Sequence, residues 1–295
     1  MAPSDQPCAD PSTAFRGSVR DRIALAGRPD AAPELLVLLA TDEADAVRLT
    51  VAENVSAPSH ADRLLAQDAV AIIRVSLARK LAAQAAELAE GLSDRRIRLA
   101  WDALLLLAQD LRNEVRHAVA DTLADMPDAP HDLVLALARD AALLVCEPLI
   151  RLSGVLTEED LLGLVRTPPG AASCTAVARR LQLAEPVCDA VVASGDIPAM
   201  AALLRNPTAQ IAEGTLGRLV DLAGQHLHLR EPLAWRPVLP ALLVPRLAEL
   251  LAEEILAQLA AETDNPLPVS RLLQARAAAA GSPSVTPSRR SWSTS

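Results

Sequence analysis

Leu104–Pro127 reads LLLLAQDLRNEVRHAVADTLADMP, and the spacing of its residues decides the fold. An apolar segment ends at Asp110, and a second one begins with Val115 and Arg116. Apolar residues in both segments recur at intervals of three and four, the period of a helix that buries one face. The stretch therefore predicts two helices joined by a short turn that carries an acid.

The acid and the arginine that follows it six positions later recur along the first half of the chain. The pairs are Asp42/Arg48, Asp68/Arg74 and Asp110/Arg116. A fourth copy keeps Asp140 but replaces the arginine with Cys146. We interpret Asn206 as the acid position of a later copy, so that 164 residues from Asp42 hold five units of about 33 residues. Repeats of this length, with two helices each, are typical of an α-solenoid.

This spacing suggests a structural role for the paired charges. An acid at the turn can accept hydrogen bonds from the free amides that open the second helix. The arginine then lies about one and a half turns into that helix and can reach the acid of its own repeat or of an adjacent one. Val47, Ile73 and Val115, each just before the arginine, are expected in the seam between repeats. We predict a structural ladder of these acids and arginines.

The prediction for the whole chain is an all-α fold, an α-solenoid of about six to seven helix pairs. Residues 1–20 and 264–295 are expected to be disordered tails, since the second is rich in Ser, Pro and small residues. Residues 21–263 form the repeat domain, with a weak division near 168–170, where two prolines precede a glycine. Thr157, three residues before Asp160, predicts a capping box.

Bulk composition restricts the function. The chain has 295 residues, 51% of them hydrophobic but only 1% aromatic, and a net charge of -9, which argues against nonspecific binding to DNA or anionic lipid. No apolar run approaches the roughly 18 residues of a membrane span, and no secretory signal is visible. The four cysteines contain no C-x-x-C pair, which favours buried free thiols in the cytoplasm.

No constellation predicts catalysis, a cofactor or a metal site. His226 and His228 are two positions apart, so on a helix they face different directions and do not form a metal pair. His117 and His131 are interpreted as surface polar residues. We therefore expect a protein that is not an enzyme.

At the repeated acids and arginines the chain resembles the HEAT-repeat superfamily. A narrower resemblance, to a bacterial domain of unknown function numbered 2336, covers roughly residues 35–260. It rests on LARD (137–140), PLIRLSGVLTEEDLLGLVR (148–166), AVARR (176–180) and LLRNPTAQIA (203–212). The resemblance implies a HEAT-like α-solenoid in the cytoplasm and supplies no reaction or catalytic residues.

Two arginine clusters are candidates for binding a partner or an anion, because arginines on stacked helices can gather on one surface. The first consists of Arg95, Arg96 and Arg98, on the helix that carries Trp101. The second consists of Arg179, Arg180 and Arg205. The alternative is that both are solvated helix faces.

Residues 244–262 predict an amphipathic helix that caps the stack, with packing against a second copy in a homodimer as the alternative. Taken together, these features favour an intracellular scaffold or adaptor that binds an unidentified protein partner, plausible as a regulator of signalling or stress responses. Two alternatives stay open. One is a nucleic-acid binder or enzyme of the HEAT-like DNA glycosylase type, and the other is a sensor that binds an anionic small ligand at an arginine cluster.

Overall fold

The computed structural model describes residues 17–88, 94–236 and 239–251. Every regular element in these ranges is a helix, which confirms the predicted all-α fold. The chain divides into two compact units, Met1–Ser173 and Cys174–Ser295 (unit 1 and unit 2), and each is described separately below. The sequence prediction had placed a weak division a few residues earlier, near 168–170.

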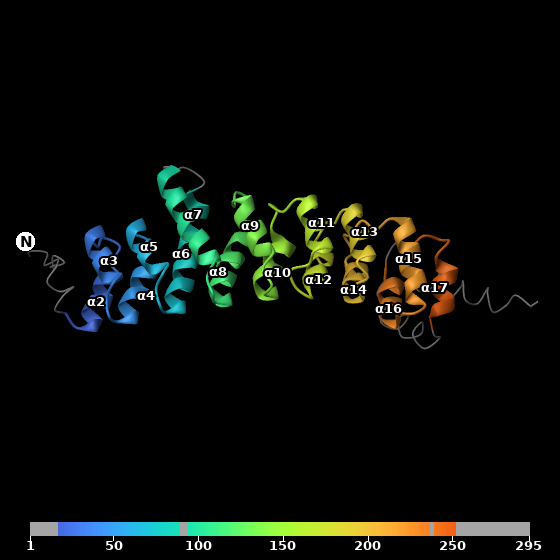
Figure 1. Cartoon of the computed structure of the whole chain (residues 1–295), viewed down its shortest axis with the longest axis horizontal. Coiled ribbons are helices and arrows are strands. Elements are labelled where there is room, and N and C mark those ends of the chain that lie inside the picture. Colours follow the sequence, from blue (N-terminus) through green and yellow to red (C-terminus); the bar gives the residue numbers. More distant parts are fainter. Residues whose placement is uncertain (1–16, 89–93, 237–238, 252–295) are drawn as a thin grey trace, which may run out of the picture. The chain divides into compact units, whose positions relative to one another are not determined.

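Unit 1 contains ten helices within its described residues (Figure 1), and short turns join successive helices wherever the connection is described. The helices are α2 (Val19–Ala26), α3 (Pro33–Leu39), α4 (Asp45–Glu53), α5 (Ser59–Leu65), α6 (Ala71–Leu88), α7 (Asp94–Ala108), α8 (Asn113–Ala124), α9 (His131–Ala138), α10 (Leu143–Leu152) and α11 (Glu158–Arg166). Capping boxes open two of them, from Ser18 to Asp21 before α2 and from Thr157 to Asp160 before α11. The second is the box predicted from the sequence.

Alternate helices of unit 1 pack into two rows. The helices α2, α4, α6, α8 and α10 contact one another in succession, and α3, α5, α7 and α9 form the second row. The residues before the ladder arginines lie in the seam of this packing, since Val47, Ile73 and Val115 are completely buried. Each helix pair therefore covers the apolar side of the next, as expected for an α-solenoid.

The long interval between Asp68 and Asp110 comes from helix length. α6 has 18 residues and α7 has 15, whereas α4 and α5 have 9 and 7. Figure 1 shows α7 extending beyond the neighbouring helices of its row. The extra residues lengthen the second helix of one pair and the first helix of the next, and α6 still contacts both α4 and α8. The stacking of unit 1 therefore continues through this irregular repeat.

Unit 2 continues with shorter and less regular helices. They are α13 (Glu185–Ala193), α14 (Ile197–Arg205), α15 (Glu213–Ala223), the 3-10 helix η1 (Leu227–Leu229), α16 (Arg230–Ala234) and α17 (Val244–Leu250). A further helix, α12 (Ser173–Ala178), begins at the last residue of unit 1. In chain order, α3 to α16 make seven successive pairs among the described residues, in agreement with the predicted six to seven.

The predicted position of Asn206 in the repeat was wrong. Asn206 follows α14, the second helix of its pair, whereas Asp42 lies between the two helices of a pair. Its counterpart is Asn54, at the end of α4. The amide of Asn54 donates to the carbonyls of Ala26 and Arg28 at 2.7 and 2.9 Å, and that of Asn206 donates to two carbonyls 28 and 26 residues earlier at 2.9 and 2.6 Å. Both asparagines satisfy the carbonyls at the end of an earlier helix.

The ends of the predicted repeat domain are only partly described. The expected N-terminal tail ends at residue 20, but α2 already begins at Val19, after the Ser18 cap. Residues 1–16 and the C-terminal tail 264–295 lie outside the described residues. Of the predicted helix 244–262, only α17 and Leu251 are described, so the homodimer alternative concerns residues mostly outside them.

Candidate functional site

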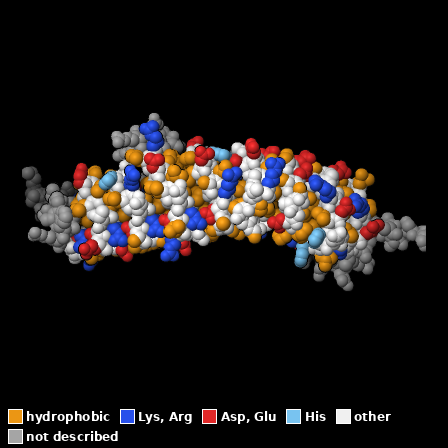
Figure 2. All heavy atoms as spheres, in the orientation of Figure 1, with side chains coloured by type: hydrophobic (Ala, Val, Ile, Leu, Met, Phe, Trp, Pro, Cys, Tyr) orange, Lys and Arg blue, Asp and Glu red, His pale blue; other side chains and the backbone are white. Residues whose placement is uncertain are grey.

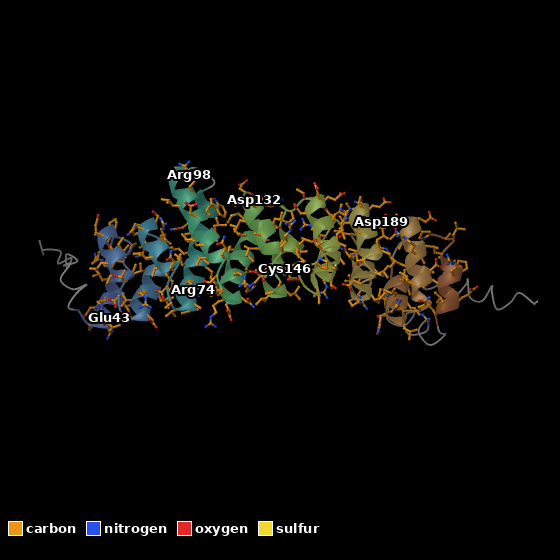
Figure 3. The ribbon with its side chains drawn as sticks, in the orientation of Figure 1. Glu43, Arg74, Arg98, Asp132, Cys146 and Asp189 are labelled. Carbon is orange, nitrogen blue, oxygen red and sulfur yellow. The ribbon has the colours of Figure 1, made fainter. Side chains whose placement is uncertain are left out.

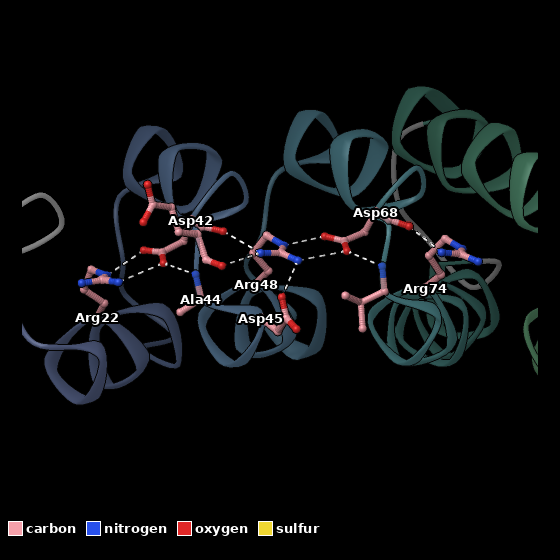
Figure 4. Close-up of polar contacts among 9 residues, drawn as sticks. Arg22, Asp42, Ala44, Asp45, Arg48, Asp68 and Arg74 are labelled. Atoms are coloured by element: carbon pink, nitrogen blue, oxygen red, sulfur yellow. Dashed lines mark hydrogen bonds and ion pairs between the residues drawn. The ribbon is translucent and has the colours of Figure 1, made fainter.

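Four arginines of unit 1 each bind the aspartate of the next helix pair, and Figure 4 shows the first two of these ion pairs, Arg22–Asp42 and Arg48–Asp68. The Nε–Oδ2 distances are 2.7 Å for Arg22–Asp42, 2.7 Å for Arg48–Asp68, 2.5 Å for Arg74–Asp110 and 2.6 Å for Arg116–Asp140. In each pair, Nη2 donates to the second carboxylate oxygen. These ion pairs therefore join successive helix pairs. The sequence left open whether each arginine reaches the acid of its own repeat or of an adjacent one, and in the structure it is the acid of the adjacent repeat.

The same groups also organise the turns. Nη1 of Arg48 donates to the Asp42 carbonyl at 2.7 Å, so this arginine fixes its own turn as well as the next acid. Asp42 in turn accepts the Ala44 amide at 2.9 Å, at the N-cap of α4. Arg74 and Arg116 likewise donate to the carbonyl of the aspartate six residues earlier. The carboxylates of the other three ladder aspartates each accept the backbone amide two residues later. Figure 2 shows the resulting alternation of basic and acidic side chains along one edge of unit 1.

Arg22 is the rung that the sequence prediction missed. The repeated pattern has an acid six positions before the arginine and an apolar residue just before it. Before Arg22 these positions hold an arginine and Asp21, so the pattern does not identify this repeat. At the other end, Cys146 stands where the next arginine would be and is buried, with its Sγ 3.8 Å from the Leu143 carbonyl. The ladder therefore runs from Arg22 to Asp140 within the described part of unit 1.

The ladder carboxylates lie in a partly desolvated environment. Burial raises the pKa of Asp110, but hydrogen bonds from Arg74 and from the Arg112 amide outweigh it and leave this pKa below its usual range. Asp42 and Asp140 have lowered pKa values for the same combination of reasons. A carboxylate held ionised in this way is a poor general base, which fits a structural role.

Replacing Asp110 with asparagine is expected to reduce the free energy of unfolding at pH 7 by about 1.5–3 kcal/mol, because a charge-assisted pair with Arg74 is lost. The lowered pKa means that this contribution is full above the unfolded value of about 3.9 and is lost as pH falls through the folded value. Chemical denaturation at pH 7 and pH 3 should show the difference between Asp110→Asn and the wild type shrinking at low pH. If the difference in free energy of unfolding between Asp110→Asn and the wild type were the same at both pH values, the ionised Asp110 carboxylate would not be the source of the stabilisation.

The first predicted arginine cluster does not form a site among the described side chains. Arg98 is exposed, and Figure 3 shows it on the opposite edge of unit 1 from Arg74. Trp101 is half-buried further along α7. Arg95 and Arg96 belong to α7, but their side chains lie outside the described residues.

The second cluster lies at a groove within unit 2 that has a volume of about 530 Å³. Thr175 of α12 and the residues after this helix form one wall, α14 and the turn after it form another, and η1 contributes a histidine. The lining residues are Thr175, Arg179, Leu181, Pro198, Ala201, Ala202, Arg205, Asn206, Pro207 and His228. None of them is acidic. We call this feature the unit 2 groove.

Two of the three predicted arginines line this groove. Arg179 is exposed, and no described residue forms an ion pair with it. Arg205 is exposed and meets Glu231 at 3.5 Å, a weak contact between two solvated side chains. Arg180 does not line the groove, and burial lowers its pKa. The structure thus brings Arg179 and Arg205 together and separates Arg180 from them.

The rim of the unit 2 groove is fixed by residues that the sequence prediction did not include in the site. Buried Arg236 donates to the carbonyls of Leu204, Asn206 and Ala209 at 2.9–3.3 Å. The Gln182 amide donates to the Thr208 hydroxyl at 2.9 Å, with a left-handed φ of 54°. Such a conformation persists only where neighbouring contacts impose it. The two turns that border the groove are therefore held rigidly.

Two of the groove residues had a signal in the sequence. Asn206 stood out, although in the wrong role, and Thr175 lies four residues before Arg179, a helical spacing that places two side chains on one face. Arg236 and His228 have no spacing that relates them to Arg179. Their proximity comes from the packing of α14 with η1 and α16.

Other kinds of site have no support in the described part of the chain. It contains no group of three or more His, Cys, Asp or Glu that could hold a metal ion. None of its helices combines the length and the hydropathy required to cross a bilayer. Cys146, Cys174 and Cys188 are buried and form no disulfide within the described residues, and burial raises the pKa of Cys188 to about 11. A thiol with so high a pKa is a weak nucleophile at neutral pH.

Comparison with known proteins agrees with the resemblance stated from the sequence. Residues 145–291 match a family model described as an uncharacterised protein conserved in bacteria (DUF2336). The match begins further along the chain and ends later than the range of 35–260 expected from the sequence, and it includes both the SGVLTEEDL and RNPTAQI segments. A search of curated proteins finds no match. Over residues 145–291, which include the whole unit 2 groove, the chain is similar to the uncharacterised bacterial family DUF2336.

Proposed function

We propose that the protein is a non-enzymatic, cytoplasmic interaction module that binds an acidic segment of a partner protein in the unit 2 groove. One observation carries the proposal. On a chain with a net charge of -9, this groove is lined by two exposed arginines and a histidine and by no acid. Arg179 has no charged partner among the described residues, so its guanidinium is available to a carboxylate from another molecule.

The dimensions and the apolar residues of the groove support a peptide ligand. A volume of about 530 Å³ is within the range of binding clefts. Leu181, which is 67% exposed, lines the groove beside Arg179. An exposed leucine next to unpaired cations suits a segment that combines acidic and apolar residues. In a bacterial cell, such a module would act as an adaptor or regulator, which is an argument from the fold alone.

The potential catalytic groups of the groove are not arranged as a nucleophile and its base, because no hydrogen bond joins Thr175 and His228 among the described residues. The lining has no carboxylate and no thiol, so it offers no acidic or sulfur nucleophile and no carboxylate base. The buried cysteines of unit 2 are not among the lining residues.

The proposal is tested by using the full chain to capture proteins from its own cell and then measuring the affinity of each purified partner. Arg179→Glu should weaken the complex by about tenfold to 100-fold, because it places a carboxylate where the partner's acid would bind. Arg79→Glu is the matched control. It makes the same charge change at an exposed arginine of α6, outside unit 2.

Partners that bind the wild type and both variants equally would refute the groove as the binding surface. Duplex DNA bound at physiological salt and lost in Arg179→Glu would favour the nucleic-acid alternative.

A further inference from the structure

Three side chains of the unit 2 groove have unused hydrogen-bonding capacity. Among the described residues, no hydrogen bond or ion pair involves the Thr175 hydroxyl, the Arg179 guanidinium or the His228 ring. A hydroxyl, a guanidinium and an imidazole can all donate to an anionic oxygen. The groove therefore presents three donors of different shapes that have no hydrogen-bond partner among the described residues.

The backbone beside the groove does not neutralise these donors. α12 and α14 both end at the groove, and the free carbonyls of a helix end would normally oppose an anion. Here those carbonyls already have donors, because Asn206 binds the carbonyls of Ala178 and Arg180 and Arg236 binds that of Leu204. The negative ends of the two helices are thus largely compensated.

Arg236 adds positive charge beneath the rim. Its side chain is buried, and its hydrogen bonds in the described structure go to carbonyls, with no carboxylate among them. A buried guanidinium that has no carboxylate partner in the described part of the chain is unusual, since buried charges are normally paired. Arg205 has Glu231 beside it at 3.5 Å, but Arg179 and Arg236 together still leave more positive charge than one carboxylate would balance.

We infer that the ligand of the unit 2 groove is a phosphorylated serine or threonine in an otherwise flexible protein segment. A phosphate monoester carries a charge of about -1.5 to -2 at pH 7 and three strong acceptor oxygens. These match two guanidinium forks and a hydroxyl donor better than a carboxylate does. This inference rests on the proposed function, because it specifies the chemistry of the segment that the same groove binds.

The test uses three peptide libraries that share random flanking positions and differ only at the central residue, which is phosphoserine, glutamate or serine. Binding to the full chain is measured by fluorescence anisotropy in phosphate-free buffer. The phosphoserine library should bind at least about tenfold more tightly than the other two. Inorganic phosphate should compete with it.

Two variants connect the binding to the groove. Arg179→Gln and Thr175→Val should each weaken phosphopeptide binding, by about tenfold or more for the arginine, whereas Arg79→Gln should leave it unchanged. Arg179 and Arg79 are both exposed, so neither change removes a buried contact.

The outcomes separate this inference from the proposed function. Equal binding of the phosphoserine and glutamate libraries, with the same loss in Arg179→Gln, would overturn the phosphate inference and leave an acidic-segment site. Phosphopeptide binding that is unaffected by both groove variants would overturn it as well. Both proposals would be refuted if no library bound and if the cellular partners bound Arg179→Glu as tightly as the wild type.

Discussion

Replacing Lys80 with methionine is expected to lower the free energy of unfolding by about 3–5 kcal/mol, because it leaves a carboxylate buried without a partner. Lys80 is the only lysine among the 28 basic residues of the chain. On α6 it forms an ion pair with Asp62 of α5, and the two side chains are only 4% and 7% exposed. Burial lowers the pKa of Lys80 and raises that of Asp62, and each charge opposes the shift of the other.

The double variant Asp62→Leu/Lys80→Met is the control for this prediction. Because it removes both charges and fills the same space with apolar groups, it should be close to wild-type stability or above it. Guanidinium denaturation followed by circular dichroism measures both variants. A loss below about 1 kcal/mol in Lys80→Met would mean that Asp62 is solvated in the folded chain, contrary to its burial.

Replacing Asn206 with alanine is expected to cost about 2–3 kcal/mol, since two carbonyls and one amide each lose a hydrogen bond. The side chain donates to Ala178 and Arg180 and accepts from the Thr208 amide at 3.1 Å. Asn54→Ala in unit 1 is the matched variant, because Asn54 makes the same three kinds of bond with Ala26, Arg28 and Ser56.

The two asparagine variants should differ in their effect on binding. Both should lower the denaturation midpoint, but only Asn206→Ala should also weaken ligands of the unit 2 groove, because Asn206 lines it and holds its rim. Hydrogen exchange should show the loss of protection near Ala178–Arg180 in Asn206→Ala and near Ala26–Arg28 in Asn54→Ala. If either variant lost protection equally in both regions, the hydrogen bonds of that asparagine would not stabilise their own turn in particular.

Much of the fold could be predicted from local spacing. The six-residue interval from Asp42 to Arg48, with an apolar residue just before the arginine, predicted both the helix pairs and the buried seam. Such patterns are visible because one helix turn places residues at fixed angles, whatever surrounds the helix. The error at Asn206 has the same origin, since an amide after one helix resembles an acid before the next when only the order of residues is known.

The sequence by itself determined that the chain forms short paired helices, that their apolar sides must be covered by neighbouring pairs, and that acids lie at the turns. These follow from the helical period and from the free amides and carbonyls at helix ends, which are local properties. Only the tertiary structure decided that Arg48 binds Asp68, that Asp62 and Lys80 are buried together, and that Arg179 meets Arg205 and His228 at one groove. Those contacts depend on how far one helix is displaced along the next, which the packing of side chains at the seam sets and residue spacing does not encode.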